Sequence, residues 1–386
     1  RFLSIADLSL AVAIGLHNIL GLRSIMLFAS ESAKAALEAD CARGARLCAF
    51  ALTEKDAGSD PRRLRTQARR QADGSWILNG SKMWTGLGAW CGAMVTFAQA
   101  YDEDDRLLGI TGFVFPAETA GSRVGKEAMT LGLRGTYQGA IHFEDLRVKP
   151  DGILGKPGEG LAQASKILMG GRIGCVAFSS GAMHRCLQIA GAYIAERKIA
   201  TGLMIENGVV YDTFARMLAK TVALDIFFDW LCDELDERDP LPDELYCAAK
   251  IIAPEWAFQV ADASMQLMGG RGYEENNVVA RIFRDIRVIR IFEGPTETIR
   301  HHLGGLVVRT DDGIQKILCD RLDAKDVFQI LSARLSQLRS CDPMQSRSDQ
   351  QRRLSWLGEI AAHALLWAVV RLAGAEQAAA RIAEEY

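Results

Sequence analysis

The stretch Arg290-Ile-Phe-Glu-Gly-Pro-Thr-Glu-Thr-Ile-Arg-His-His-Leu303 places an acidic residue, Glu293, between an apolar run and a break in the chain. Residues 288–292 are mostly apolar, Gly294-Pro295 ends any regular element, and a helical pattern starts at Thr296. If the apolar run is buried, the carboxylate is poorly hydrated, which raises its pKa and makes it a stronger base. Such a base can take a proton from a carbon beside a carbonyl. The alternative is an exposed loop acid at a helix start.

Further motifs surround this stretch at regular places along the chain. Ala51-Leu-Thr-Glu-Lys-Asp-Ala-Gly-Ser-Asp60 lies far upstream, and Gln266-Leu-Met-Gly-Gly-Arg-Gly-Tyr273 lies shortly before Glu293. Between them come Asn79-Gly-Ser-Lys-Met-Trp84, Leu131-Gly-Leu-Arg-Gly-Thr136, Phe143-Glu-Asp145 and Glu196-Arg-Lys198. This set, in this order, resembles the acyl-CoA dehydrogenase family over about residues 10–310, and many motifs in register are far more specific than one. The longer-chain members are the nearest match, because they also carry a helical extension after this core.

Composition excludes several other classes of protein. The chain has 386 residues, 49% hydrophobic and 24% charged, with a formal net charge of −3, so it is typical of a globular protein and not of a nucleic-acid binder. Its nine cysteines form no Cys-x-x-Cys pair and its six histidines show no metal-ligand spacing. We therefore expect reduced thiols, no metal, and a cytoplasmic location, or the mitochondrial matrix in a eukaryote.

Two apolar runs could be mistaken for membrane segments. Leu8–Leu22 and Ile360–Ala375 are both shorter than the roughly 20 residues that span a bilayer. The first also lacks the basic start and the cleavage site of a signal peptide. Membrane association is therefore not indicated.

Residue patterns divide the chain into four parts and predict an α+β fold. Residues 1–48 have helical apolar periodicity, and relatives carry further helices before this point, so we expect an incomplete N-terminal helical domain. Residues 49–155 alternate short apolar runs with Gly and Pro turns, which predicts a small antiparallel β domain. Residues 156–310 contain helices long enough for a four-helix bundle. Residues 311–386 form an extension with two helical stretches, Asp323–Leu338 and Trp356–Glu385.

The resemblance implies an FAD site, and it assigns particular residues to each part of the cofactor. Phe50 and Thr53 would lie along the flavin, with Trp84 against its ring and Thr85 supplying a hydroxyl. Trp84 could instead be a core aromatic of the sheet. The remaining assigned cofactor residues are Ser59, Arg197, Gln266, Gly269, Gly270, Thr296 and Glu297.

Two of these assignments have a clear physical reason. The planar guanidinium of Arg197 suits the FAD pyrophosphate because it donates parallel hydrogen bonds, although an ordinary surface arginine would look the same. Gly269-Gly270 would let the backbone approach a phosphate closely, or would simply end a helix. The chain departs from the family pattern at Gly86, Ala200 and Pro295.

On the substrate side, the resemblance places Ser59 near the thioester and Arg172 near the phosphate-bearing end of the carrier. Phe292 and Gly294, which flank the base, complete the assigned substrate contacts. Arg62 and Arg63 add basic charge beside this region, which suits a phosphate-bearing carrier or an acyl carrier protein, or is an ordinary solvated surface.

The implied function is FAD-dependent α,β-dehydrogenation of an acyl thioester. Glu293 would take the α proton, the flavin would accept the β hydrogen as hydride, and an electron-transfer flavoprotein would receive the electrons. A homodimer or homotetramer is expected. An acyl-CoA oxidase, a biosynthetic dehydrogenase acting on a carrier-protein thioester, and a non-catalytic scaffold protein on the same fold are the alternatives, because fold alone does not fix function.

Overall fold

The computed structural model describes residues 1–309, 312–339, 346–375 and 378. The chain forms two compact units, which are described separately. A sheet unit comprises residues 9–171, and a helical unit comprises residues 1–8 and 172–386.

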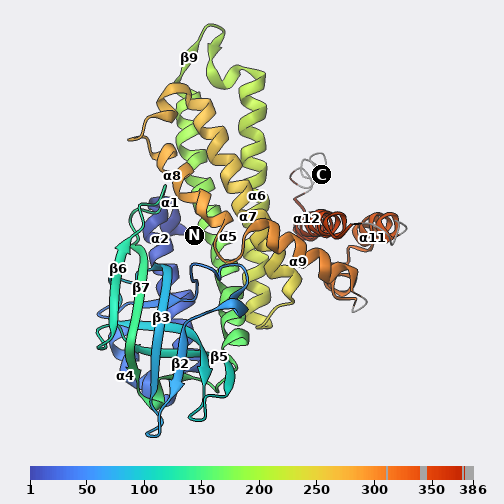
Figure 1. The fold of residues 1–386 in the computed structure, drawn as a ribbon. Coiled ribbons are helices and arrows are strands. Elements are labelled where there is room, and N and C mark those ends of the chain that lie inside the picture. Colours follow the sequence, from blue (N-terminus) through green and yellow to red (C-terminus); the bar gives the residue numbers. More distant parts are fainter. Residues whose placement is uncertain (310–311, 340–345, 376–377, 379–386) are drawn as a thin grey trace. The chain divides into compact units, whose positions relative to one another are not determined.

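The sheet unit is built on an eight-stranded sheet in the order β6-β7-β3-β2-β4-β5-β8, with β1 added beside β4 (Figure 1). The strands are β1 Cys48–Ala51, β2 Gln67–Arg70, β3 Trp76–Gly86, β4 Ala93–Tyr101, β5 Leu107–Pro116, β6 Ser122–Glu127, β7 Gln138–Val148 and β8 Ile153–Leu154. Aromatic pairs fill its interior, among them Trp76 with Phe113 and Phe115 with Phe143, at 5.5 and 5.8 Å between ring centroids. The five apolar runs that predicted strands all fall within β3, β4, β5 and β7.

The sheet differs from the predicted antiparallel domain in one respect. Strand β4 pairs in parallel with both β1 and β2, whereas the other pairings are antiparallel. The direction of β4 is set by its antiparallel neighbour β5, and β1 and β2 reach it only after long connections. Parallel pairing needs such long connections, and local turn signals do not reveal it.

The N-terminal helices of this unit are α2 Leu8–Gly15, α3 Arg23–Phe28 and α4 Glu31–Ala42, with a π-helical turn at Leu16–Leu22. The helical run therefore continues to Phe28, beyond the predicted end at Leu22, and its 21 residues are long and apolar enough by composition to cross a bilayer. That corrects the expectation that the run is too short. Within the protein, 44% of the apolar window is buried, and the buried His17 accepts a hydrogen bond from the Cys48 N–H at 2.9 Å.

The helical unit is a bundle with short connections. Its main helices are α5 Gly160–Glu196, which enters the unit at Arg172, α6 Gly208–Glu237, α7 Asp243–Met268, α8 Val278–Ile286 and α9 Thr296–Val308, with the short α1 Phe2–Ala6 (Figure 1). A small hairpin, β9 Lys198–Ile199 with β10 Gly202–Leu203, joins α5 to α6. Helical sequence patterns predict four of these helices, α5, α6, α7 and α9, at residues 161–196, 209–236, 242–268 and 296–308, which agree with the structure to within one residue at each end. The nine-residue α8 was not predicted, although Asn277 caps it by accepting from the Val279 N–H at 2.8 Å.

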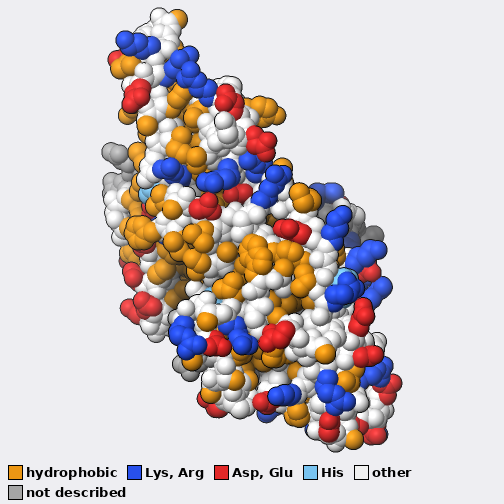
Figure 2. Space-filling model, turned by 90° about the vertical axis from the view of Figure 1, so that its left-hand side faces the viewer, with side chains coloured by type: hydrophobic (Ala, Val, Ile, Leu, Met, Phe, Trp, Pro, Cys, Tyr) orange, Lys and Arg blue, Asp and Glu red, His pale blue; other side chains and the backbone are white. Residues whose placement is uncertain are grey.

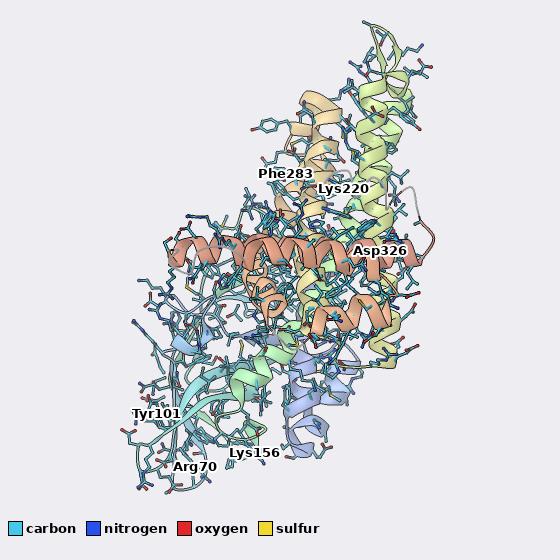
Figure 3. The ribbon with its side chains drawn as sticks, turned by 90° about the vertical axis from the view of Figure 1, so that its right-hand side faces the viewer. Arg70, Tyr101, Lys156, Lys220, Phe283 and Asp326 are labelled. Atoms are coloured by element: carbon cyan, nitrogen blue, oxygen red, sulfur yellow. The ribbon has the colours of Figure 1, made fainter. Side chains whose placement is uncertain are left out.

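The C-terminal extension packs on this bundle. It contains α10 Gly313–Gln315, a π-helical turn at Lys316–Arg321, α11 Lys325–Arg339 and α12 Arg347–Leu372. Helix α12 starts nine residues before the predicted Trp356, because Ser346 caps it and the polar residues after Ser346 form its first turns. The helix ends at Leu372 and is followed by a turn in which Gly374 has a φ of 70°, so the predicted continuation is wrong at this point, while the predicted end at Glu385 lies outside the described residues. Arg371 of α12 pairs with Asp326 of α11, which Figure 3 labels.

Helices α9 and α12 cross with their backbones in contact. A Cβ on Gly304 would lie 1.9 Å from the Leu354 carbonyl oxygen, and a Cβ on Gly358 would lie 1.9 Å from the Arg300 carbonyl oxygen. An ion pair between Arg300 and Glu359, at 2.7 Å, lies beside this crossing. Only glycine at both positions allows so close an approach.

Candidate active site

The loop that carries Glu293 is tightly built. The N–H groups of Ile291 and Phe292 both donate to the Val288 carbonyl, at 2.8 and 3.2 Å. Arg290 donates to Glu255 of α7 at 2.7 Å and so ties the loop to the bundle. Glu293 and Gly294 then both have positive φ, 57° and 96°. A non-glycine residue in this region is strained, and such strain persists where the surroundings hold the residue in place.

The Glu293 carboxyl group is poorly hydrated, although the residue as a whole is half-buried. Its Oε2 atom is buried and has no hydrogen-bond partner among the described residues. Burial raises the pKa of Glu293 to about 7, against the opposing charges of Lys250 and Arg172. A general base works best when its pKa lies near the working pH, so this carboxyl group has the properties of a base and not of an exposed loop acid.

Side chains of α5 and α7 surround the base loop. Arg172 is partly buried, and its Nε lies 3.5 Å from the backbone carbonyl oxygen of Glu293. The expected role of Arg172 was contact with the substrate carrier, and the structure adds a contact with the base loop that the motif did not reveal. Lys250 and Cys175 are fully buried, and both interact electrostatically with Glu293.

Three potential metal ligands also lie together near Arg172. The ligand atoms of Asp243, Cys247 and His302 are all within 4.8 Å of one another. Asp243 bonds His302 at 2.7 Å, while Arg172 Nη1 lies 3.5 Å from Asp243 Oδ1 and 3.7 Å from Cys247 Sγ. The guanidinium of Arg172 therefore already supplies a positive charge beside these three side chains. We interpret the three side chains as the group that holds Arg172 in place. Linear spacing could not reveal the group, because His302 comes from a different helix.

A second set of predicted residues lies at the other end of the bundle. Cys186 bonds Ser264 there, whereas Arg172 meets Cys247, so α5 and α7 run side by side in the same direction. Arg197 is therefore roughly 37 Å along α5 from Arg172. Gln266 lies roughly 24 Å along α7 from Lys250 by the same measure.

This far end is exposed and open. Arg197, Gln266, Gly269 and Gly270 are all exposed. Gly269 has a φ of +59°, and a Cβ on either glycine would meet no atom within 4 Å. An exposed guanidinium and an uncovered glycine backbone are the groups that bind a phosphate, so this end fits the phosphate part of FAD.

In the sheet unit, the predicted flavin residues sit on a rigid support. The buried Lys82 bonds Glu54 at 2.7 Å and the Leu52 carbonyl at 3.2 Å, and the Met83 N–H donates to the Thr53 carbonyl at 2.9 Å. These bonds fix the Thr53 loop against β3. Glu54 and Lys82 were not singled out from the sequence, although each lies inside a motif.

The side chains on this support are available to a ligand. Trp84 has a φ of 52° and is 57% exposed, so it is not a core aromatic of the sheet. Thr85 is buried, and its hydroxyl has no hydrogen-bond partner among the described residues. Ser59 is exposed, whereas Phe50 is half-buried and packs on Phe97 at 5.3 Å. An exposed indole beside an unsatisfied hydroxyl fits a planar, polar ring such as a flavin.

The other predicted contacts lie around the base. Phe292 and Gly294 flank Glu293, and a Cβ on Gly294 would lie 2.7 Å from Ile299 Cδ1. Thr296 is buried and its hydroxyl donates to the Arg290 carbonyl at 3.4 Å, while Glu297 is exposed. Thr296 thus already has a structural bond within its own loop.

Comparison with known proteins shows the family. The model of the acyl-CoA dehydrogenase middle domain matches residues 49–146, and that of the C-terminal domain matches residues 158–305. Human short-chain specific acyl-CoA dehydrogenase is 34% identical over 307 residues, which are 78% of this chain and 73% of that protein. Butyryl-CoA dehydrogenase from Megasphaera elsdenii superposes with a TM-score of 0.75 at 28% identity, covering 80% of each chain.

A third match extends into the C-terminal extension. Acyl-CoA dehydrogenase from Bacillus anthracis, solved with FAD, superposes with a TM-score of 0.82 and covers 95% of this chain and 68% of that one. At 23% identity this match speaks for the fold alone. The predicted family and fold are confirmed: the chain belongs to the acyl-CoA dehydrogenase family, whose members are FAD-dependent oxidoreductases.

Proposed function

We propose that this chain binds FAD and dehydrogenates an acyl thioester at its α and β carbons, with Glu293 as the catalytic base. The observation that carries the proposal is the Glu293 carboxyl group, whose Oε2 is buried without a hydrogen-bond partner among the described residues and whose pKa burial raises to about 7. A scaffold protein has no need of such a group, which is costly to maintain.

The chain's own residues have separate tasks in this reaction. Glu293 accepts the proton from the α carbon, and its backbone N–H is the proposed donor to the thioester oxygen, where negative charge develops. Phe292 and Gly294 shape the pocket wall beside the base. FAD, when bound, supplies the electron acceptor. In the sheet unit Thr53, Trp84 and Thr85 would hold its ring.

We further propose that the enzyme is a homodimer or a homotetramer, in which Arg197, Gln266 and Gly270 bind the FAD of a neighbouring chain. The axial separation of roughly 37 Å between Arg197 and Arg172 supports this, because one cofactor at Glu293 is far from Arg197 of the same chain. Figure 2 shows that apolar side chains also gather across the middle of one face of the molecule. Exposed apolar side chains on α6 are Val209, Tyr211, Leu218 and Val222, which would suit a dimer interface.

The proposed electron acceptor is an electron-transfer flavoprotein, as in the family. All eight cysteines that the structure describes have free thiols. Free thiols are typical of a reducing compartment, so the proposed location of the enzyme is the cytoplasm or, in a eukaryote, the mitochondrial matrix. Cys341 lies outside the described residues.

The test is anaerobic reduction of the purified flavoprotein by a series of acyl-CoA and acyl-carrier-protein thioesters. We expect one FAD per chain, bleaching by at least one thioester, and formation of the trans-2-enoyl product. Bleaching only by the carrier-protein thioester would favour the biosynthetic alternative, and rapid reoxidation by air would favour an oxidase. A colourless protein that binds no FAD would overturn the proposal in favour of the scaffold alternative.

A further inference from the structure

Lys250 is a buried lysine whose Nζ has no hydrogen-bond partner in the described part of the chain. It lies in α7 with 0% of its surface exposed, and no described residue accepts a hydrogen bond from its Nζ. Burying an ammonium group without a partner costs several kcal/mol, and the usual response is loss of the proton. A lysine kept at such a position therefore needs a nearby negative charge or a task.

The helix around Lys250 is also interrupted. Pro254 lies inside α7, four residues after Lys250. Proline has no N–H, so the helical hydrogen bond to the Lys250 carbonyl is missing, and the ring disturbs the turn that it would have closed. The polar side chain and the weakened turn coincide in an otherwise apolar stretch of the helix.

The charged and titratable groups that face Lys250 are Cys175 and Arg172 of α5, Glu255 of its own helix, and Glu293. Burial raises the pKa of Cys175 to about 12, so this thiol is neutral at physiological pH. Arg172 is itself a cation. Neither group can balance the charge of Lys250.

The two carboxylates near Lys250, Glu255 and Glu293, differ in their hydrogen bonds. Glu255 already accepts a hydrogen bond from Arg290 at 2.7 Å. Glu293 has an Oε2 that is buried and unpartnered among the described residues, as is the Lys250 ammonium. Two opposite charges that interact with each other, and whose buried atoms have no hydrogen-bond partner among the described residues, account for each other's presence.

We propose that Lys250 is a positioning residue for the reaction: a buried cation, paired with Glu293 by charge and not by a hydrogen bond, that keeps the carboxylate able to accept a proton. This inference rests on the proposed role of Glu293 as the base. A direct hydrogen bond would weaken the carboxylate as a base, whereas a charge at a distance favours its ionised form and leaves its oxygens free.

The electrostatic consequence has a definite sign. Burial raises the pKa of Glu293, and the charge of Lys250 lowers it, with a smaller effect in the same direction from Arg172. Removing the ammonium therefore moves the pKa of Glu293 further above 7. In the other direction, burial lowers the pKa of Lys250 and the charge of Glu293 raises it.

The first test measures protonation and needs no turnover. Protein labelled with ¹³C at the glutamate carboxyl carbons is titrated by NMR, and the Glu293 signal is identified by its absence in Glu293→Gln. Lys250→Met should shift the midpoint of the Glu293 titration upward by roughly one pH unit or more. Lys250→Arg keeps the positive charge, so its midpoint should lie close to that of the wild type. Lys316→Met, at an exposed lysine of the same unit, is the matched control and should leave the midpoint unchanged. An unchanged midpoint in Lys250→Met would show that Lys250 is merely structural.

The second test is kinetic. The rate of flavin reduction should fall about tenfold per pH unit below the pKa of the base. In Lys250→Met this acidic limb should move upward with the NMR midpoint, while the rate on the alkaline plateau changes less. A uniform loss of rate at every pH, with the limb in place, would contradict the proposal.

A reciprocal measurement covers the case in which Lys250→Met does not fold. Protein labelled at the lysine ε carbon is titrated in the wild type and in Glu293→Gln, where the pKa of Lys250 should fall because its negative partner is gone. An unchanged lysine midpoint would refute the pairing. The two NMR experiments also separate this inference from the proposed function. If the pKa values of Lys250 and Glu293 depend on each other but no thioester reduces the flavin, the pairing holds and the proposed reaction is wrong. If the flavin is reduced but the two pKa values are independent, the reaction holds and the pairing is wrong.

Discussion

The two ends of the helical unit present opposite environments. At one end Lys250 and Cys175 are buried and so is the Oε2 atom of the half-buried Glu293, whereas at the other end Arg197 and Gly269-Gly270 are exposed, with open space around the glycines. The enclosed end suits proton transfer, because burial tunes a carboxyl group toward neutral pKa values. The open end suits binding of a phosphate that arrives from outside. The difference indicates that chemistry and cofactor retention depend on separate residues, and this separation can be tested.

The largest effect is expected from Glu293→Gln, which keeps the shape of the side chain and removes its basicity. Flavin reduction by the best thioester should slow by roughly 10²–10⁴-fold, while FAD stays bound. Stopped-flow absorbance of the flavin measures the rate, and the absorbance spectrum gives the cofactor content. Glu275→Gln, an identical change at an exposed residue of the same unit, should have the wild-type rate. A near-normal rate of flavin reduction in Glu293→Gln would show that another residue is the catalytic base.

The same substitution should stabilise the protein, because the enclosed end holds a carboxyl group that burial disfavours in its charged form. The folded-state pKa of about 7 exceeds the ordinary glutamate pKa of 4.5, so the folded protein binds more protons than the unfolded one between these values. Stability therefore falls as pH rises from 4.5 to 7, by at most about 3 kcal/mol. Thermal unfolding of the two proteins should diverge over this range, with Glu293→Gln the more stable above pH 7. Parallel pH profiles would show that the carboxyl group is not dehydrated.

At the open end, Arg197→Ala should weaken FAD retention by about 10- to 100-fold, the value of a charge-assisted contact with phosphate. If FAD is shared between chains, the loss of FAD should be accompanied by dissociation of the dimer on dilution, measured by sedimentation. Arg352→Ala, on the exposed side of α12, serves as the control. A monomer that keeps stoichiometric FAD would remove Arg197, Gln266 and Gly270 from the cofactor site. The Glu293 titration should not change in Arg197→Ala if the two ends are independent.

The smallest effect is expected from Gly270→Ala. A Cβ at this position meets no atom within 4 Å and the residue has no positive φ, so folding should not be affected. Any weakening of FAD binding, expected to be a few-fold, would then report close approach of the cofactor to the backbone. Gly269→Ala is less informative, because its φ of +59° makes a side chain strained with or without cofactor. Unchanged FAD affinity in Gly270→Ala would show that Gly269 and Gly270 only end helix α7 and do not contact the cofactor.

The sequence predicted the residues that lie within motifs far better than those that support them. The long helices followed from local patterns, because a 26-residue helix such as α7 leaves a local signature. Glu293 was assigned from the family resemblance, because an exposed loop acid would give the same local pattern. Lys250 was missed, although a lone lysine in the apolar stretch after Leu245 is itself a signal of a buried cation. The group of Asp243, Cys247 and His302 could not be found in this way, because tertiary folding alone brings α7 and α9 together. The parallel pairing of β4 with β1 and β2 was not predicted for the same reason, because it depends on contacts between segments that are distant in the sequence.

The glycine crossing of α9 and α12 has a consequence for how the protein is made. Because Gly304 and Gly358 let the two backbones touch, a helix with a larger side chain in place of Gly358 could not approach α9 as closely as α12 does. A ribosome needs several seconds to synthesise the residues from Val308 to Leu372, and during that time the glycine face of α9 lacks its cover. Nascent chains that stop before α12 would expose this face to chaperones and proteases. Chains truncated before α12 are therefore expected to be degraded faster than the full chain.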